Sequence, residues 1–433
     1  NNKRSGEYIK MSVDMKHEIK MSDKIISFIQ PSRNNRKYLE WSYNSIRKHL
    51  GYRHEICVFS DFSNDGTIEW CEEISKKDNN FKYIVNDGTW FGENTGEPSR
   101  MGHTLGYDKL INEVATNDIV MIYHADMYAL PDMDTEVLKH IKPGVVVSAT
   151  RIEPPLHPEG PEKVIKDFGI EPEEFKEQEL LNWYDMDYTW EQETTEGIFA
   201  PWAIYKKDFQ SIGGHDPLYA PQSKEDSDIF NRFVLAGYKL IQTREGCVYH
   251  MTCRGSRFAD GAKRNPDGEV FMKNRETDEW LAQNQRSTRN FLRKWGTMVE
   301  HDELLKPVIT PKYNIGFNLT ERCSVNTFGE LEPYCSKIYI DDEMLIKQYI
   351  AQEQPATDFN LQDRVSVDIV EDTDIIVTFN PLLVTQHNFG ILINLPKIIQ
   401  DSGEVGEFEL EIFNIKINKI KTYEKELIKC NIS

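Results

Sequence analysis

The 433-residue sequence has no apolar run that approaches the roughly twenty residues needed to span a membrane as a helix. Its first twenty or so residues are polar and lack the apolar core of a secretion signal, so residues 1–22 are predicted to be a flexible leader. Only seven cysteines are present, and none forms a Cys-x-x-Cys pair. We therefore expect reduced thiols and a cytoplasmic protein.

Positive charge is also scarce. The sequence has 51 Lys and Arg but 71 Asp and Glu, so its formal net charge is −20. This balance argues against a nucleic-acid groove or an anionic membrane surface, both of which favour basic faces. The length predicts two or three domains. We expect an α/β domain over residues 23–300 and an all-β, sandwich-like domain over residues 301–433.

The most informative segment lies at residues 212–250. Gly213 and Gly214 predict a tight turn. Acidic residues gather at 225–228, directly before an amphipathic pattern that stops near Gly237, so they are expected at the start of a helix, where the helix dipole favours negative charge. An ionised Asp226 there could serve as a general base, although acidic residues at helix starts are also common as caps.

Three apolar stretches upstream predict strands that end in polar loops. The first, residues 24–30, runs into Pro31, Ser32 and Arg33, and the second, residues 55–60, runs into Asp61. Because crevices at the carboxyl ends of parallel strands bind nucleotides, these loops are candidates for a nucleotide site. The third strand, residues 118–123, ends at His124, Ala125 and Asp126.

The order of these features closely resembles family 2 glycosyltransferases. The resemblance covers about residues 24–296 and includes the Gly-Gly-x-Asp turn, the Glu225-Asp226 pair, Gly237-Tyr238 and the late His250. It implies a GT-A fold with a mixed central sheet. It also implies that Asp226 deprotonates the acceptor and that Asp126 and His250 hold a divalent metal, Mn²⁺ or Mg²⁺.

The same resemblance predicts the donor site. A UDP- or GDP-linked sugar is expected to contact the loop residues named above, with Arg100 in a glycine-rich segment either a further contact to the diphosphate or a solvated surface residue. Independently of the resemblance, Arg254 and Arg257 lie in a basic segment that could close over the donor or could be an exposed loop. That glycine-rich segment is no P-loop, since it lacks the Gly-Lys-Ser/Thr ending. One motif acid is missing, because His124 stands where these enzymes usually carry the earlier acid of Asp-x-Asp. His124 is therefore assigned either to the ribose or to altered nucleotide handling.

A carbohydrate or glycoconjugate acceptor is expected to face the region between the third strand and the Gly213-Gly214 turn. The predicted contacts are Trp202, Gly214 and Glu225. The aromatic residues of 152–196 are further candidates, although aromatic residues fill cores more often than they bind sugars.

From about residue 307 the pattern changes to short alternating segments at 337–340, 365–369, 375–379, 389–395 and 408–417, which predict the β-rich domain. That domain could bind glycan, mediate homo-oligomerisation or attach the chain to an assembly. The whole sequence thus predicts an inverting, metal-dependent glycosyltransferase. A non-catalytic glycan-binding or assembly protein on a decayed transferase fold and a nucleotidyltransferase remain as alternatives.

Overall fold

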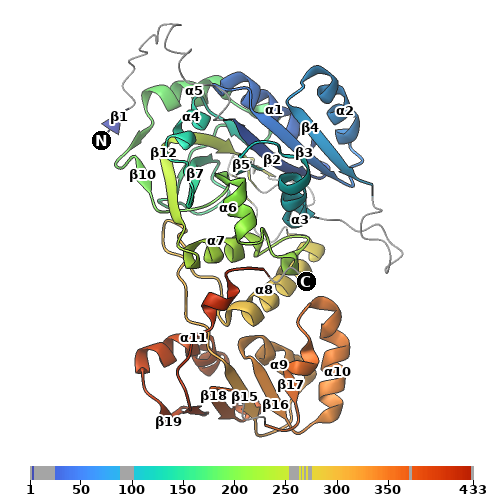
Figure 1. Cartoon of the computed structure of the whole chain (residues 1–433), viewed down its shortest axis with the longest axis vertical. Coiled ribbons are helices and arrows are strands. Elements are labelled where there is room, and N and C mark those ends of the chain that lie inside the picture. The colour runs from blue at the N-terminus through green and yellow to red at the C-terminus, as the bar shows by residue number, and fades with distance from the viewer. Residues whose placement is uncertain are drawn as a thin grey trace.

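The computed structural model describes residues 2–3, 25–87, 102–252, 263–264, 266–267, 270–271, 276–369 and 373–430. The predicted leader thus falls almost entirely outside the described residues. Two lobes lie one above the other, and helix α8 (Asp278–Trp295) lies between them (Figure 1). Among the described residues no helix is long and apolar enough to cross a membrane.

The upper lobe is built on a ten-stranded mixed sheet whose main path has the order β10-β12-β7-β11-β5-β2-β3-β4. Strands β2, β3, β4 and β5 pair in parallel, whereas β11 is antiparallel to both of its neighbours, β5 and β7. The predicted mixed α/β fold is confirmed for this lobe. Its strands are β2 (Ile26–Ser32), β3 (Glu55–Asp61), β4 (Phe81–Asn86), β5 (Ile119–Ile122), β6 (Met127–Ala129), β7 (Val145–Glu153), β8 (Lys163–Ile165), β10 (Thr194–Thr195), β11 (Trp202–Tyr205) and β12 (Lys239–His250).

Helices cover this sheet because their apolar faces match the hydrophobic surface of the strands. In α1 the buried side chains Tyr38, Leu39, Ser42, Ser45 and Ile46 recur at helical spacing. The helices of the lobe are α1 (Arg36–His49), α2 (Thr67–Lys77), α3 (Gly102–Lys109, continued by a π-helical turn at Leu110–Val114), α4 (Met133–Leu138), α5 (Glu177–Met186), α6 (Lys206–Ser211) and α7 (Glu225–Leu235).

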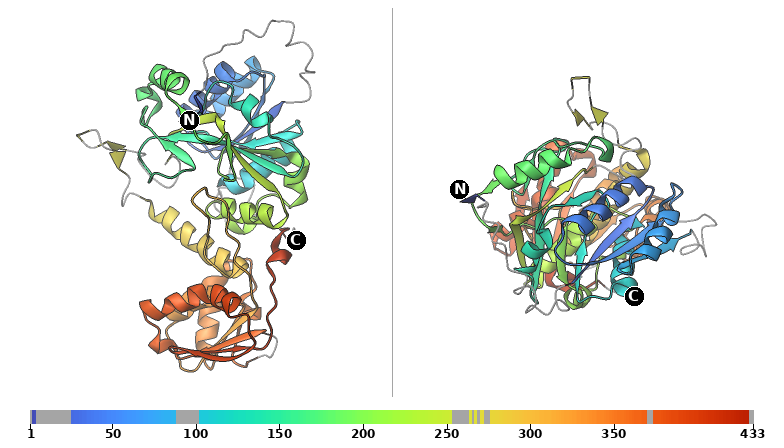
Figure 2. Two further views of the ribbon diagram at one scale, coloured as in Figure 1. Left: turned by 90° about the vertical axis from the view of Figure 1, so that its left-hand side faces the viewer. Right: turned by 90° about the horizontal axis from the view of Figure 1, so that it is seen from above.

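Among the described residues, two two-stranded sheets are separate from the ten-stranded sheet. Strand β1 (Asn2–Lys3) pairs with β9 (Thr189–Trp190), and β13 (Lys263–Arg264) pairs with β14 (Val270–Phe271). The β13–β14 hairpin projects from the body of the upper lobe (Figure 2). Arg264 on this hairpin forms ion pairs with Asp167 and Glu174, at 2.7 and 2.9 Å.

The lower lobe corrects the prediction of an all-β sandwich. It contains one six-stranded sheet of order β17-β16-β15-β18-β20-β19, in which the first four strands are parallel and β20 is antiparallel to both of its neighbours, β18 and β19. Helices α9 (Val325–Leu331), α10 (Glu343–Glu353) and α11 (Gln386–Ser402) pack on it, so the lobe is α/β. The strands are β15 (Ile315–Leu319), β16 (Lys337–Ile340), β17 (Val365–Ser366), β18 (Ile375–Phe379), β19 (Gly406–Leu410) and β20 (Phe413–Ile417).

The error has a local cause. Residues 389–395 were expected to form a strand, but they lie inside α11, where Leu392, Leu395 and Ile399 are buried at helical spacing. The helix begins with a capping box in which the Thr385 hydroxyl accepts from the backbone of Asn388, while the Asn388 side chain accepts from the backbone of Thr385. A short apolar run does not by itself distinguish a strand from a buried helix face.

Candidate active site

The candidate active site is a cleft of about 980 Å³ at the carboxyl ends of strands β2, β3 and β5. Ten of the residues predicted from the sequence line it, although they come from distant parts of the chain. They are Pro31, Ser32, Arg33, Asp61, His124, Ala125, Asp126, Glu225, Asp226 and His250. A volume of this size suits a small organic ligand.

Two other predicted residues, Trp202 and Gly214, do not line the cleft. Trp202 is fully buried and packs against aromatic rings of the core, including Phe230 and Phe233, so it is not a wall of the cleft. Gly214 is also absent from the lining, because its turn packs against Asp108. Both acceptor assignments are therefore corrected. Arg100, Arg254 and Arg257 lie outside the described residues.

The aromatic residues expected to grip the acceptor are mostly core residues as well. Tyr184 and Tyr188 are buried, and their hydroxyls donate to the backbone oxygens of Glu245 and Arg244, at 2.7 and 2.8 Å. Polar side chains from the same part of the chain line the cleft instead. They are Arg151, His157, Glu162 and Lys163.

One side of the cleft is formed by the ends of β2 and β3. One Asp61 carboxylate oxygen accepts from the Asn86 side chain at 2.7 Å, and the other accepts from the backbone N–H of Gly102 at 2.9 Å. Arg33 lies nearby, and its buried Nη1 has no hydrogen-bond partner among the described residues. Burial lowers the pKa of Arg33, and Asp61 opposes that shift. An unsatisfied guanidinium nitrogen is a ready donor for an anionic ligand.

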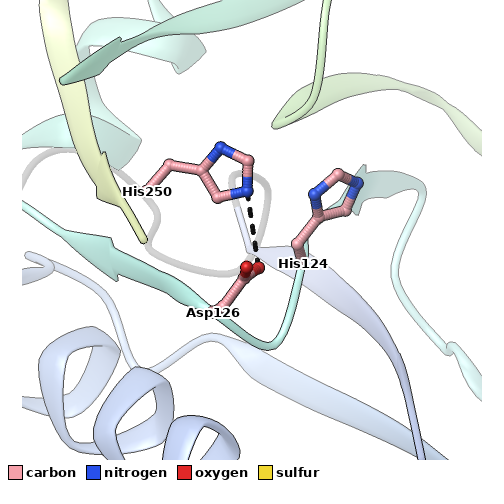
Figure 3. Close-up of side chains that lie close together, drawn as sticks. All are labelled: His124, Asp126 and His250. Carbon is pink, nitrogen blue, oxygen red and sulfur yellow. Dashed lines mark ion pairs between the residues drawn. The ribbon is translucent and has the colours of Figure 1, made fainter. Parts of the chain in front are cut away.

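Three side chains at the ends of β5 and β12 point toward one another (Figure 3): His124, Asp126 and His250. Each offers one ligand atom, and these atoms lie within 4.8 Å of one another. The register of the sheet produces this grouping, because antiparallel pairing of β12 with β6 places His250 opposite Met127. His250 Nε2 is 3.4 Å from Asp126 Oδ1.

A residue missed at the sequence level lies behind this group. Glu153, at the end of β7, is fully buried and accepts from His250 Nδ1 at 2.9 Å. Although burial opposes the shift, Asp126 and Glu153 raise the pKa of His250 to about 9. Burial, with a further contribution from His250, lowers the pKa of His124 to about 3, so His124 is neutral. The signal in the sequence was the position of Glu153 at a strand end.

The opposite wall of the cleft is the first turn of α7. Gly213 and Gly214 adopt positive φ angles of 87° and 68°, as the predicted turn requires, and Gly237 with φ 81° follows the helix. Asp226 faces the cleft, and burial together with the neighbouring Glu225 raises its pKa to about 6. Ser223 and Lys224, directly before this helix, have φ of 81° and 74°, a strained conformation for residues with a side chain.

The third acid of the cluster has a structural role. Asp228 is fully buried and accepts from Arg232 Nε at 2.8 Å and from Trp295 Nε1 at 2.9 Å. Lys294 bridges Asp228 and Asp216, at 2.6 Å from each. Cys430 lies close enough to make a second ligand-like group with these two acids, but Lys294 and Arg232 already neutralise them.

Comparison with known proteins gives one family match. Residues 27–95 match the model described as glycosyl transferase family 2. No curated protein sequence matches the chain.

Several solved structures are similar at low identity. The crystal structure of GalNAc-T7 with UDP, GalNAc and Mn²⁺ is 15% identical with a TM-score of 0.40, over 52% of this chain and 43% of that chain. TarS 1–349 from S. aureus in complex with UDP is 16% identical with a TM-score of 0.36, over 52% and 60%. The mannosyltransferase PcManGT from Pyrobaculum calidifontis in complex with GDP-Man and Mn²⁺ is 18% identical with a TM-score of 0.36, over 54% and 59%.

This chain thus spans less than two thirds of each of those solved chains. Because the TM-scores are low, any mechanism depends on the geometry described above. The family match is independent of them. Over residues 27–95, the chain carries the resemblance to glycosyl transferase family 2 that its own motifs predict.

Proposed function

We propose that the protein is a GT-A glycosyltransferase that moves a sugar from a nucleoside diphosphate to an acceptor hydroxyl, with inversion at the anomeric carbon. One observation carries the proposal: Asp61, Asp126, Asp226 and His250, from four separate segments, line a single cleft of about 980 Å³. The family match over residues 27–95 supports the donor half of this assignment.

The donor nucleotide is assigned to the ends of β2 and β3. Asp61 is held by two hydrogen bonds, so its carboxylate is a fixed acceptor for ribose or base N–H and O–H groups. Arg33 supplies the complementary group, a guanidinium N–H that can donate a hydrogen bond to an anionic part of the ligand. UDP- and GDP-linked sugars are both compatible with these groups, and the resemblance to family 2 supports either.

A divalent metal fits the group of His124, Asp126 and His250. One carboxylate and two imidazoles suit Mn²⁺ better than Ca²⁺, and Glu153 would orient His250 by accepting from its other ring nitrogen. His124 would thus take over as a ligand at the position of the missing motif acid. When bound, a Mn²⁺ or Mg²⁺ ion would neutralise charge on the diphosphate.

Asp226 is the proposed general base. Its carboxylate would accept the proton of the acceptor hydroxyl while the acceptor oxygen bonds to the anomeric carbon and the bond from that carbon to the diphosphate oxygen breaks. The electron pair of the broken bond leaves with the nucleoside diphosphate. Because attack and departure occur on opposite faces of the sugar, the product has the inverted configuration.

The test is nucleotide release from a panel of UDP- and GDP-linked sugars with Mn²⁺, using water or added saccharides as acceptors. Asp226→Asn is expected to lower the rate by about 10²–10⁴-fold, the range for loss of a general base, with UDP or GDP affinity changed only a few-fold. Since the base must be ionised, the wild-type rate should fall as pH drops through about 6. Retained turnover in Asp226→Asn would exclude this carboxylate as the base.

A further inference from the structure

A histidine from the donor side of the cleft contacts the carboxylate pair on the opposite wall. His103, the second residue of α3, donates from Nε2 to Oε1 of Glu225 at 2.6 Å. The Glu225 side chain is 6% exposed and that of His103 37% exposed, so the pair lies at the cleft surface. The other oxygen of Glu225 is buried and has no hydrogen-bond partner within the part of the chain that the structure describes.

The turn that carries His103 is fixed at both ends. On the nucleotide side, the N–H of Gly102 donates to Asp61 at 2.9 Å. On the base side, Thr104 donates from its hydroxyl to the backbone oxygen of Pro221 at 3.2 Å, four residues before Glu225. Gly102 also approaches Pro221 so closely that a Cβ would lie 2.0 Å from that oxygen. The first turn of α3 therefore connects the donor loop to the start of α7.

The charges around this contact make His103 the counterion of Glu225. Within the described residues, the groups that interact electrostatically with the pair are Asp226 on α7, Asp61 at the end of β3, Tyr107 on α3, His215 before α7 and His124 after β5. Burial opposes charge on both partners. Despite this effect of burial, the charge and hydrogen bond of Glu225 raise the pKa of His103, and those of His103 lower the pKa of Glu225.

We propose that His103 is a positioning residue for Asp226: it holds Glu225 ionised and in place, and so leaves Asp226 as the carboxylate that takes the acceptor proton. Through Gly102 and Asp61 the same turn makes the placement of the base dependent on the donor site. The inference rests on the proposed function and names a residue that the motif does not contain.

The test compares His103→Ala and His103→Gln with the wild type in nucleotide release from the UDP- or GDP-linked sugar selected by the panel. His103→Ala is expected to lower kcat about 10–100-fold, with KM for the nucleotide sugar changed less than about 3-fold. It should also move the acid limb of the pH–rate profile upward by on the order of one pH unit, because Glu225 and Asp226 would then compete for a proton. His103→Gln keeps a hydrogen-bond donor to Glu225 but loses the charge, so it should restore part of kcat while the acid limb stays shifted upward.

The matched control is His387→Ala, which removes an exposed histidine 3.3 Å from Glu411 in the lower lobe. If His103→Ala behaves like this control, or if it weakens UDP binding while the acid limb stays in place, the positioning role is overturned. If instead the wild type releases no nucleotide and binds neither UDP nor GDP with Mn²⁺, the proposed function fails, and the two failures are thereby distinguished.

Discussion

His250 lies between two carboxylates, Asp126 and Glu153, and only the first of them faces the cleft. Glu153 also accepts from Arg151 at 2.8 Å and is fully buried. Although burial opposes ionisation, the hydrogen bond from His250 and the charge of Arg151 hold the pKa of Glu153 well below its usual range. Glu153 is therefore held as an anion beside His250, where it is placed to orient the imidazole.

Glu153→Gln tests this assignment. The amide keeps the size of the side chain but removes its charge, so we expect Mn²⁺-dependent UDP or GDP affinity to fall by about 10–100-fold in calorimetry. The control is Glu159→Gln, because Glu159 is an exposed glutamate in the segment that follows β7. Equal affinities in the two variants would show that Glu153 does not support the metal ligands.

The sequence identified the residues that touch the cleft better than those that support it. Asp61, Asp126, Asp226 and His250 follow strands or open a helix, so their positions could be predicted from local pattern. Glu153 also ends a strand, but its role and that of His103 could not be assigned from local pattern, because they depend on contacts with His250 and Glu225 that are 97 and 122 residues away. Trp202 was misassigned because an aromatic residue gives no sign of which face of a strand is buried.

At the scale of elements, α3 depends on the conformation of its first residue. Gly102 has a φ of 70°, a region that costs a residue with a Cβ about 1–2 kcal/mol. The close approach to Pro221 adds a steric conflict with backbone, which cannot rotate away.

Gly102→Ala should therefore destabilise the fold by more than about 2 kcal/mol and weaken UDP or GDP binding, since the N–H of Gly102 donates to Asp61. Denaturant unfolding and calorimetry measure the two effects. Gly144→Ala is a matched control, because Gly144 has a φ of 75° but no atom within 4 Å of the position that a Cβ would occupy. If both variants lose the same stability, the contact with Pro221 contributes nothing.

The strands of the lower lobe show what an element's pattern can predict. Strands at 337–340 and 375–379 agree with the prediction. The first is buried at its last three positions, and the second is buried at alternate positions. The segment 408–417 is two strands, since Glu411 takes a φ of 52° and reverses the chain. Parallel pairing of β15 with β16 and β18 could not be predicted, because it is set by helices that the apolar pattern concealed.

At the scale of the whole molecule, α8 joins the lobes through buried charges. Arg293 on α8 donates to Glu332 at 2.8 Å and to Glu353 at 2.8 Å, and Arg364 also donates to Glu332. At the other end of the same helix, Trp280 lines the cleft. Helix α8 therefore carries one wall residue of the candidate active site at one end and contacts the lower lobe at the other.

Glu332→Ala should lower the free energy of unfolding by about 3–5 kcal/mol, because it leaves two buried guanidinium groups without their shared partner. Guanidinium chloride titration measures the loss, with Glu330→Ala, at an exposed position, as control. A loss equal to that of the control would mean that Glu353 and the backbone oxygens satisfy both arginines.

The ladder between β6 and β12 fixes His250 opposite Met127, one residue beyond Asp126. Side chains alternate faces along a strand, so a single inserted residue between Cys247 and His250 would turn the imidazole to the other side of the sheet. The residues of the connecting loops are not part of this pairing. In the proposed transferase, the preference for the donor sugar and the acceptor could therefore be changed by exchanging loops. The number of residues between Cys247 and His250 would have to stay the same.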